Sequence, residues 1–445
     1  MYKMPHTYAE AVCLMEREVQ CQRGSSRTED CSIYNACDRA VSATIHSPIS
    51  TPEYDTSAMD GFALSSAATE TASLETPVTF EVTAATTAGD KPHSEVDDLK
   101  DGIPPCVEIM TGAPFPLGRD SGRYDCCVPV EDVVVTESKF SSRHYIAVSK
   151  PAKRCQHRRF AGGDFSKRDV ILQVGEIVRP QHVMAMASVG LAHIPVMRRP
   201  RVALFSTGNE LLSPDSIGRP HDFMVHDANG PYLTTVLRKC GADVYFHGVV
   251  QDSPEAIQDA ISTSVGDDYD IIVTTGAVSA GRCDFVPSLV SRVGGRTVFH
   301  KAAIRPGHPI LFSMFPCGGH ETAFFGLPGN PVAAAACLRF FVLRYLKRLQ
   351  FQKADEPQTV SLTLSNPGTN GPSQSSCVES QVLSFRKDPD IFRPGISMPC
   401  SKQVWIIDDH SPGKTKPFLY ANCWVHIPSG VSELHEGSSV DIYPC

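Results

Sequence analysis

The amino-acid sequence predicts a multidomain protein of α/β and β architecture, built around a doubly wound α/β domain. A length of 445 residues is too great for one hydrophobic core and predicts roughly two to four domains. A hydrophobic content of 42% with 20% charged residues is typical of a folded protein. Strand and helix patterns alternate from about residue 200 to about residue 350, and short β-rich runs lie on either side.

The N-terminal part predicts a helix and a small β domain. Apolar residues recur at helical spacing over residues 7–20. Within residues 78–149, Gly, Pro and charged turns separate three β-rich runs: "VTFEVTAATTAG", "CVEIMTG" and "CCVPVEDVVV". The apolar run over 183–197 is short and contains His193, which favours a packed core segment over a membrane span.

From Arg201 the pattern predicts repeated strand–helix units and therefore a mostly parallel sheet. The predicted strands are "RVALFS", "ADVYFHGVV", "YDIIVTTG" and "TAFFG". The predicted helices are "NGPYLTTVLRKCG", "SPEAIQDAISTSV", "FVPSLVSRVGG" and a long helix after Asn330. Ser253 is the expected N-cap of the second helix, with Pro254 at its first position. After Pro357 the chain is β-like again, in the runs "VSLTLS", "CVESQVLSF", "QVWII", "CWVHI" and "SSVDIYP", with "SNPGTNGPSQSS" as a loop.

Composition argues against several classes of protein. A net charge of −8 and an isoelectric point near 6.1 argue against a general nucleic-acid binder. Sixteen cysteines without a C-x-x-C pair, and without Cys/His pairing that predicts a metal site, indicate reduced thiols and many core residues. The N-terminus is too acidic for a signal peptide, and no run of about 18 apolar residues exists. We expect a soluble, cytoplasmic protein that binds no nucleic acid and no membrane.

Four turns in the α/β domain follow predicted strands, and parallel sheets bind ligands beyond the carboxyl ends of their strands. These turns are "FSTGNEL", "VVQDSP", "TTGAVSAGRCDF" and "GLPGNP". Small residues there leave room for a phosphate-bearing ligand against backbone N–H groups. Any one of these turns is as easily structural, because strand-to-helix turns are rich in glycine for steric reasons.

Charged residues near these turns are candidates for ligand binding. Carboxylates suit a hard cation such as Mg²⁺, which also accepts water and phosphate oxygens; the candidates are Glu210, Asp227, Asp252 and Asp284. Asp252 fits the role of a helix N-cap about equally well. Lys301 and Arg305 are either anion clamps or surface charges.

Three polar residues on turns of the N-terminal part, and one cysteine of the α/β domain, are further candidate functional residues. Asp55 and Asp60 flank a small-residue turn, and Thr111 lies on a Gly-Pro turn, although plain β-turns would look the same. Cys283 has no general base placed near it by the sequence, which favours a bystander thiol over a nucleophile.

Taken in order, nine stretches resemble the molybdopterin molybdenumtransferase family, which includes bacterial MoeA and the C-terminal domain of gephyrin. They are "DTSAMDGFA", "IMTGAPFP", "PVEDV", "GGDF", "FSTGNEL", "HDANG", "TTGAVSAGRCDF", "IRPGHP" and "GLPGNPV". The resemblance implies four domains: an elongated linking domain (1–45 with 147–198), a β domain (46–146), an α/β molybdopterin-binding-like domain (199–350) and a C-terminal β-barrel (355–445). It also implies a homodimer whose active sites lie between the α/β domain of one subunit and the β domain of the other.

The chemistry implied by the resemblance is cleavage of adenylylated molybdopterin in the presence of Mg²⁺ and molybdate, which yields molybdenum cofactor and AMP. A partner protein would supply the adenylylated substrate. The implied catalytic residues are Asp60, Thr111, Asp252 and Asp284. The implied metal ligands are Glu210, Asp252 and Asp284. The implied binding residues are Gly208, Glu210, Asp227, Gly276, Ser279, Gly281, Lys301, Arg305, Pro328 and Gly329.

Four residues depart from the family pattern. Ala277 stands for a glycine, Arg282 for an acid, Gly163 for a glutamate and His308 for a lysine. The expected pocket is more positive by about two charges as a result. The departures leave two alternatives to an insertase: a relative that acts on another phosphate-bearing small molecule, and a non-enzymatic dimeric scaffold. The retained acids at 60, 210, 252 and 284 favour the insertase over the scaffold.

Overall fold

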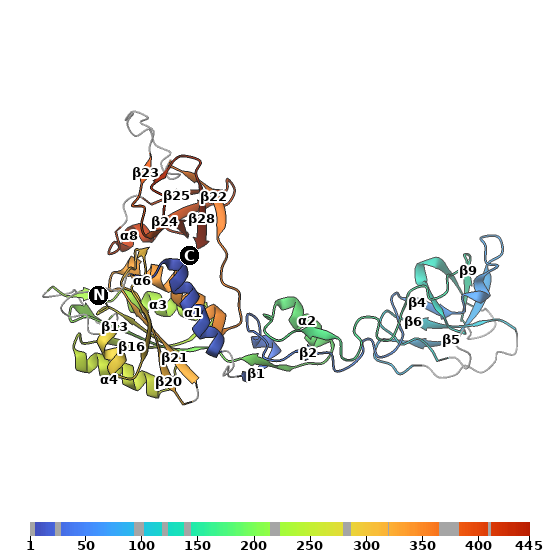
Figure 1. Cartoon of the computed structure of the whole chain (residues 1–445). Coiled ribbons are helices and arrows are strands. Elements are labelled where there is room, and N and C mark those ends of the chain that lie inside the picture. Colours follow the sequence, from blue (N-terminus) through green and yellow to red (C-terminus); the bar gives the residue numbers. More distant parts are fainter. Residues whose placement is uncertain are drawn as a thin grey trace.

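The chain is described by a computed structural model that covers residues 5–22, 28–92, 102–117, 123–137, 144–213, 223–278, 286–318, 320–364, 382–407 and 411–445. Figure 1 shows an elongated, bent molecule. The α/β sheet and the C-terminal strands lie together at one end, helix α2 (Pro180–Ser188) lies in the narrow middle, and strand β4 (Gly61–Leu64) lies at the far end (Figure 1). No helix in these described ranges is long and apolar enough to cross a membrane.

The α/β domain is built on a six-stranded sheet in the order β16-β13-β17-β21-β20-β18. Its strands are β13 (Arg201–Thr207), β16 (Asp243–Val250), β17 (Ile271–Thr275), β18 (Arg296–His300), β20 (Leu311–Cys317) and β21 (His320–Leu327). The first four strands in spatial order are parallel, whereas β20 is antiparallel to both of its neighbours. The mostly parallel sheet predicted from the sequence is confirmed.

Helices cover both faces of this sheet. They are α3 (Asn229–Lys239), α4 (Pro254–Gly266), α5 (Val286–Arg292), and α6 (Pro331–Cys337), which continues through the π-helical segment η5 (Leu338–Val342) into α7 (Leu343–Leu349). Successive residues of a strand point to opposite faces. Val202 and Leu204 accordingly share a core with α3, α6 and α7, while Ala203 and Phe205 share one with α4 and α5. This arrangement is the doubly wound fold that the sequence predicts.

Helix α1 (Tyr8–Gln22) also packs on the α/β domain, against α7 and β18. Its apolar face, including Met15 and Val19, joins the same core as α3 and α7. Arg296 of β18 donates two hydrogen bonds to Glu18, at 2.9 and 2.8 Å. The family resemblance implied that residues 1–45 belong to the linking domain. In the structure, the apolar face of α1 is instead buried in the core of the α/β domain.

Two small antiparallel sheets form the linking domain. One pairs β1 (Thr28–Ser32) with β12 (His193–Met197), and the other pairs β2 (Ile45–His46) with β11 (Val170–Leu172). Helix α2 contributes Met186 to their common core, and β12 contributes Ile194. The apolar run over 183–197 therefore packs as a core segment, as expected. A short pairing of β3 (Thr56–Ser57) with β10 (Arg158–Arg159) leads into the next domain.

The β domain is a six-stranded sheet in the order β7-β4-β6-β5-β9-β8. Besides β4, it contains β5 (Val78–Thr86), β6 (Pro105–Ile109), β7 (Cys126–Pro129), β8 (Val133–Glu137) and β9 (His144–Val148). Phe80 and Ile146 are fully buried in its core. Short 3-10 turns connect some of these strands: η3 (Ala67–Thr69) and η4 (Val130–Asp132), with η2 (Ile33–Asn35) in the linking domain.

Five C-terminal strands close into a barrel through the pairing of β24 with β26. They are β22 (Gln358–Thr363), β24 (Asp390–Met398), β25 (Gln403–Ile406), β26 (Cys423–Ile427) and β28 (Ser439–Pro444). The short strand β19 (Ile304–Arg305) of the α/β domain pairs in parallel with β24, which joins the two domains through backbone hydrogen bonds. The predicted loop "SNPGTNGPSQSS" lies outside the described residues. Shorter elements complete the chain: β14 (Leu211–Leu212), β15 (Val225–His226), β23 (Leu383–Ser384), β27 (Glu433–Leu434) and α8 (Thr415–Phe418).

Candidate active site

The four turns singled out in the sequence meet at one edge of the α/β sheet. Strands β13, β16, β17 and β21 are parallel, so their carboxyl ends share that edge, which we call the strand-end edge. Adjacent turns are hydrogen-bonded to each other. The Thr207 hydroxyl donates to the Thr275 carbonyl at 2.9 Å, and the Gly276 N–H donates to the Leu327 carbonyl at 2.9 Å. Gly208 and Gly329 belong to the same group of turns.

Glycine is required at the third turn by its surroundings. Gly276 has φ +92°, and a Cβ there would lie 2.5 Å from the Thr207 hydroxyl oxygen and 2.6 Å from the Thr207 carbonyl oxygen. Its neighbour Ala277 has φ +53°, a left-handed conformation that costs a non-glycine residue on the order of 1 kcal/mol. Ala277 therefore has a left-handed backbone conformation that glycine adopts at a lower cost in free energy.

Two acids lie at this edge in adjacent turns. Glu210 is exposed, and its carboxylate folds back over Gly208, where a Cβ would lie 2.8 Å from Glu210 Oε2. The backbone N–H of Asp252 donates to Asn209 Oδ1 at 3.0 Å, which ties the second turn to the first. Ser253, and not Asp252, caps helix α4, because its hydroxyl accepts from the Ala256 N–H at 3.2 Å. The predicted N-cap is confirmed, and the alternative capping role of Asp252 is wrong.

Asp227 lies at the same edge but has structural hydrogen bonds. It is 4% exposed and accepts from the Ser206 hydroxyl at 2.8 Å. It also accepts from the backbone N–H groups of Asn229 and Gly230, at 2.9 and 3.1 Å, at the start of α3. The side-chain amide of Asn229 in turn donates to the Gly329 carbonyl at 2.8 Å. Asp227 thus links the end of β13 to the start of α3 by hydrogen bonds. Its part in ligand binding stays a prediction.

The rest of the third turn lies outside the described residues. This applies to Ser279, Gly281, Arg282, Cys283 and Asp284, whose roles stay predictions.

Beside the strand-end edge, a cavity of about 570 Å³ lies between the α/β domain and the barrel; we call it the junction cavity. Arg305 and Pro328, both predicted site residues, line it, together with Arg386 and Arg393 from the C-terminal domain. Burial lowers the pKa of the Arg393 guanidinium from its usual value, and Arg393 Nε is buried with no hydrogen-bond partner among the described residues. An arginine remains a cation in this situation. Three guanidinium groups around one cavity suit an oxyanion.

His308 also lines the junction cavity, where the family pattern has a lysine. Its Nδ1 lies 2.8 Å from the carbonyl oxygen of Ala302, so the ring is fixed against the backbone. Lys301 lies at a left-handed position, φ +72°, three residues before β19, and is not among the residues that line the cavity.

The two predicted catalytic residues of the β domain bind each other. Asp60 Oδ1 accepts from the backbone N–H of Thr111 at 2.6 Å and from its hydroxyl at 2.8 Å. These bonds, the backbone one first, hold the pKa of Asp60 below its usual value. Asp60 is exposed, so an ionised, fixed carboxylate faces solvent at the end of β domain strand β6. Asp55, by contrast, is used in an ion pair with Arg158.

Gly163, the third departure, lies in a tight turn beside Asp55. A Cβ at this position would lie 2.9 Å from the Phe160 carbonyl oxygen, which accepts a hydrogen bond from the Gly163 N–H at 3.0 Å. The turn therefore leaves too little room for a Cβ at position 163, and a glutamate there would require the backbone to shift.

Within one chain, Asp60 and Thr111 lie far from the strand-end edge. Figure 1 shows β4 and β6, whose ends carry them, at the opposite end of the molecule from β13 and β16, with the linking domain in between. Lys301 apart, the predicted residues that the structure describes thus lie in two groups, and one chain does not bring the two groups together.

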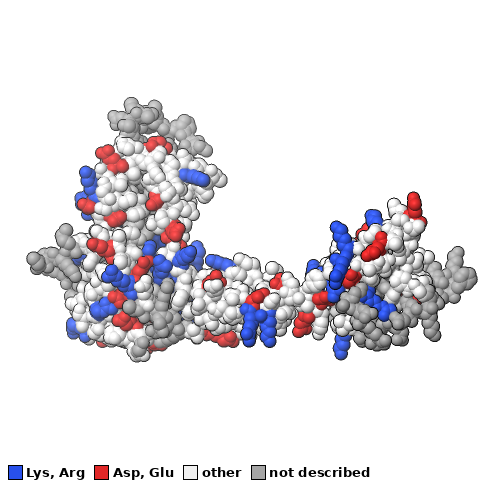
Figure 2. Space-filling model, turned by 45° about the vertical axis from the view of Figure 1, so that its right-hand side comes forward, with Lys and Arg blue, Asp and Glu red and all other residues white. Residues whose placement is uncertain are grey.

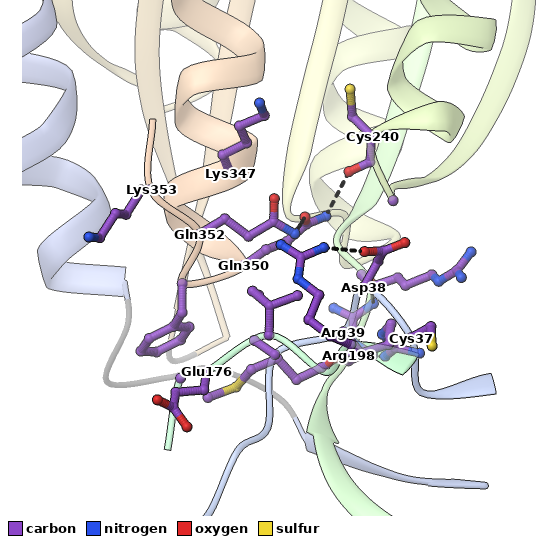
Figure 3. Close-up of a pocket in the computed structure, with 18 of the residues that line it drawn as sticks. Cys37, Asp38, Arg39, Glu176, Arg198, Cys240, Lys347, Gln350, Gln352 and Lys353 are labelled. Carbon is purple, nitrogen blue, oxygen red and sulfur yellow. Dashed lines mark hydrogen bonds and ion pairs between the residues drawn. The ribbon is translucent and has the colours of Figure 1, made fainter. Parts of the chain in front are cut away.

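A second cavity, of about 890 Å³, lies between the linking domain and the α/β domain (Figure 3). Its charged groups are partly paired: Arg179 donates to Asp38 at 2.8 Å, and Arg198 to Asp270 at 2.7 Å. In the space-filling view, Lys and Arg gather near this junction with Asp and Glu among them (Figure 2). None of the predicted site residues that the structure describes lines this cavity.

Comparisons with known proteins point to one family. The family described as MoeA N-terminal region (domain I and II) matches residues 6–190, and that described as probable molybdopterin binding domain matches residues 203–348. A molybdopterin molybdenumtransferase from Synechococcus elongatus is 31% identical over 405 residues, 91% of either chain. One from Haemophilus influenzae is 32% identical over 330 residues, 74% of either chain.

The same likeness holds in three dimensions. The crystal structure of a molybdopterin biosynthesis MoeA protein from Pyrococcus horikosii matches with a TM-score of 0.78 at 25% identity, covering 99% of both chains. Sequence and fold agree over nearly the whole length, including the strand-end edge and the β domain. The chain therefore belongs to the molybdopterin molybdenumtransferase family.

Proposed function

We propose that this protein is an enzyme that inserts molybdenum into molybdopterin. Its substrates are adenylylated molybdopterin and molybdate, and its products are molybdenum cofactor and AMP. The observation that carries this proposal is the junction cavity, where three arginines from two domains converge beside the strand-end edge. A scaffold has no need of a buried guanidinium nitrogen, Arg393 Nε, without a hydrogen-bond partner among the described residues, which costs free energy in the absence of an anion.

Molybdate is a compact oxyanion with two negative charges, and we place it in the junction cavity. Arg305 comes from strand β19, and Arg393 from strand β24, which pairs with β19. The two guanidinium groups are therefore carried by neighbouring strands of one sheet. Arg386 adds a third positive charge. An anion there would satisfy Arg393 Nε and offset the positive charge of the lining.

The strand-end edge suits the phosphates of the adenylylated substrate. Glycines at 208, 276 and 329 add no side chain of their own, which lets a ligand approach their backbone, and the Glu210 carboxylate is the neighbouring group that lies over Gly208. Such a ligand would lie directly beside the junction cavity, since Pro328 belongs to both. The edge therefore positions the phosphoanhydride near the oxyanion.

The acids of this edge fit a magnesium ion. Glu210 and Asp252 offer two carboxylates from adjacent turns, and Mg²⁺ is commonly held by one or two carboxylates with water and substrate phosphates completing its shell. When bound, the ion neutralises phosphate charge during cleavage. Asp284 is a third proposed ligand, outside the described residues.

We further propose that the active enzyme is a homodimer. Asp60 and Thr111 lie too far along the chain to reach their own strand-end edge (Figure 1). A second copy would bring its β domain to that edge, so that an ionised Asp60 completes the site and acts on the attacking water.

The test measures AMP release and formation of active cofactor from adenylylated molybdopterin, molybdate and Mg²⁺. We expect both products with wild-type protein, and loss of both with Asp60→Ala in a folded chain. Binding without AMP release would favour a scaffold. Absence of binding by a folded dimer would show that the departures at 163, 277, 282 and 308 mark another ligand.

Arg393 gives the sharper test of the molybdate position. Arg393→Met should raise the molybdate concentration needed for half-maximal rate by about ten- to a hundredfold, since a charge-assisted hydrogen bond is worth roughly 1.5–3 kcal/mol. Arg199→Met, in the second cavity, is the matched control and should leave it unchanged. If the two variants need the same molybdate concentration for half-maximal rate, molybdate does not bind in the junction cavity.

A further inference from the structure

Three potential metal ligands meet at the edge of the α/β sheet opposite the strand-end edge. They are Asp268 in the turn before β17, Cys317 at the end of β20 and His320 at the start of β21. Their ligand atoms all lie within 4.8 Å of one another, and all three residues are half-buried. The sequence analysis found no Cys/His pairing that predicts a metal site, although Cys317 and His320 have the C-x-x-H spacing.

The fold explains why these side chains converge. Cys317 and His320 are directly opposite each other in the antiparallel pairing of β20 with β21, which sets their Cβ atoms about 4.5–5.5 Å apart. Asp268 takes a left-handed conformation, φ +64°, which Asp tolerates better than most residues. Its Oδ1 lies 3.2 Å from His320 Nε2. Two ligands each about 2.0 Å from a tetrahedral zinc ion are separated by about 3.3 Å.

We propose that Asp268, Cys317 and His320 form a zinc site with water as the fourth ligand. Thiolate, imidazole and carboxylate are the donors that Zn²⁺ takes, and tetrahedral geometry suits three protein ligands. On binding, the Cys317 thiol releases its proton to solvent and gives up its hydrogen bond to the Val265 carbonyl, now 3.2 Å. The ion would fasten the β20–β21 hairpin to the turn that precedes β17.

This site is separate from the proposed chemistry. Strands β17 and β21 run from it to the strand-end edge, so the full length of the sheet lies in between. Its effect is therefore on stability, because a ligand that binds only the folded state raises the unfolding temperature.

The experiment uses the full chain, freed of metal with a chelator and titrated with Co²⁺ and with Zn²⁺ against a chromophoric competitor. We expect one ion per chain and, with Co²⁺, a thiolate-to-metal charge-transfer band. Cys317→Ser should abolish the band, and His320→Asn should weaken Zn²⁺ binding by at least about tenfold. Cys13→Ser, which changes an exposed cysteine on α1, should behave as wild type.

Folding is checked by AMP release and by unfolding temperature. Should Cys317→Ser fail to fold, Asp268→Asn provides a second variant at a position on the surface side of the cluster, and it should also weaken Zn²⁺ binding and remove the rise in unfolding temperature. Retention of the band or of wild-type affinity in folded Cys317 and Asp268 variants overturns the proposal.

Discussion

At the scale of single residues, the hydrogen bond between Thr111 and Asp60 matters because it controls the charge of an exposed carboxylate. Thr111 contributes a backbone N–H and a hydroxyl, and both favour the ionised form. A lowered pKa keeps Asp60 ionised to a more acidic pH than an ordinary aspartate. In its proposed role Asp60 is therefore ionised and able to accept a proton at neutral pH, as a weaker base than an ordinary aspartate.

Thr111→Val removes the hydroxyl and keeps the backbone bond. The pKa of Asp60 should rise part of the way to its usual value, because the backbone bond has the larger effect. The acidic limb of the pH–rate profile for AMP release should therefore move to higher pH. Thr136→Val, at an exposed position of β8, is the control. An unmoved acidic limb would show that Asp60 is not the group that sets it.

Gly276 is predicted to be intolerant of any side chain. Gly276→Ala should lower the free energy of unfolding by about 1–3 kcal/mol, through strain at positive φ and contact with Thr207. Gly248→Ala has a similar φ, +86°, but its Cβ would meet no described atom within 4 Å. Urea unfolding of the two variants separates strain from contact. Equal losses would mean that the tight turn is not a steric constraint.

At the scale of elements, the N-terminus of helix α4 is the clearest local prediction. Ser253→Ala should lower the free energy of unfolding by about 1 kcal/mol, since the Ala256 N–H loses its partner. Ser253→Asp should be near wild type, because aspartate is an equally good cap. Chemical denaturation measures both. A stable Ser253→Ala would instead mean that the end of α4 is held by packing alone.

The elements of the α/β domain were largely predictable, and the reason is local. The four predicted strands are short apolar runs, and three of them end in a turn that contains glycine, so neighbouring residues show where they end. Strands β18 and β20 of the same sheet were not predicted. Strand β24 was not predicted, because Arg393, Pro394 and Gly395 interrupt its apolar pattern. The junction cavity was missed with it, since Arg393 enters the site only through the pairing of β24 with β19.

Contacts between distant residues were beyond local patterns. Asp60 and Thr111 are 51 residues apart, and nothing in their spacing predicts that they bind each other. Asp227 looked like any other acid at a turn, and its burial and three hydrogen bonds give it a structural role that the sequence did not show. The amphipathic pattern of α1 predicted a helix without saying which core would receive its apolar face.

At the scale of the whole molecule, a dimer with shared sites predicts complementation. Asp60→Ala and Arg393→Met change opposite halves of the proposed site, so each homodimer should have low activity at a molybdate concentration that gives the wild type its half-maximal rate. In an equal mixture that exchanges subunits, a mixed dimer has one intact site and one site with both changes. About one quarter of the wild-type rate should return. Activity that stays at the level of the separate variants would place both halves within one chain.

The pairing of β1 with β12 has a consequence for how this molecule is assembled. Thr28 lies opposite Met197, so the chain leaves the α/β domain after α1 and returns before β13 at nearly the same point. In topological terms, everything between these two residues is an insertion with adjacent ends. Replacing residues 28–197 by a short flexible loop should therefore leave α1, the sheet and the barrel as a compact protein that folds by itself. Residues 28–197 would then be an insertion that can be removed. The arginines of the junction cavity would belong to the part that folds without it.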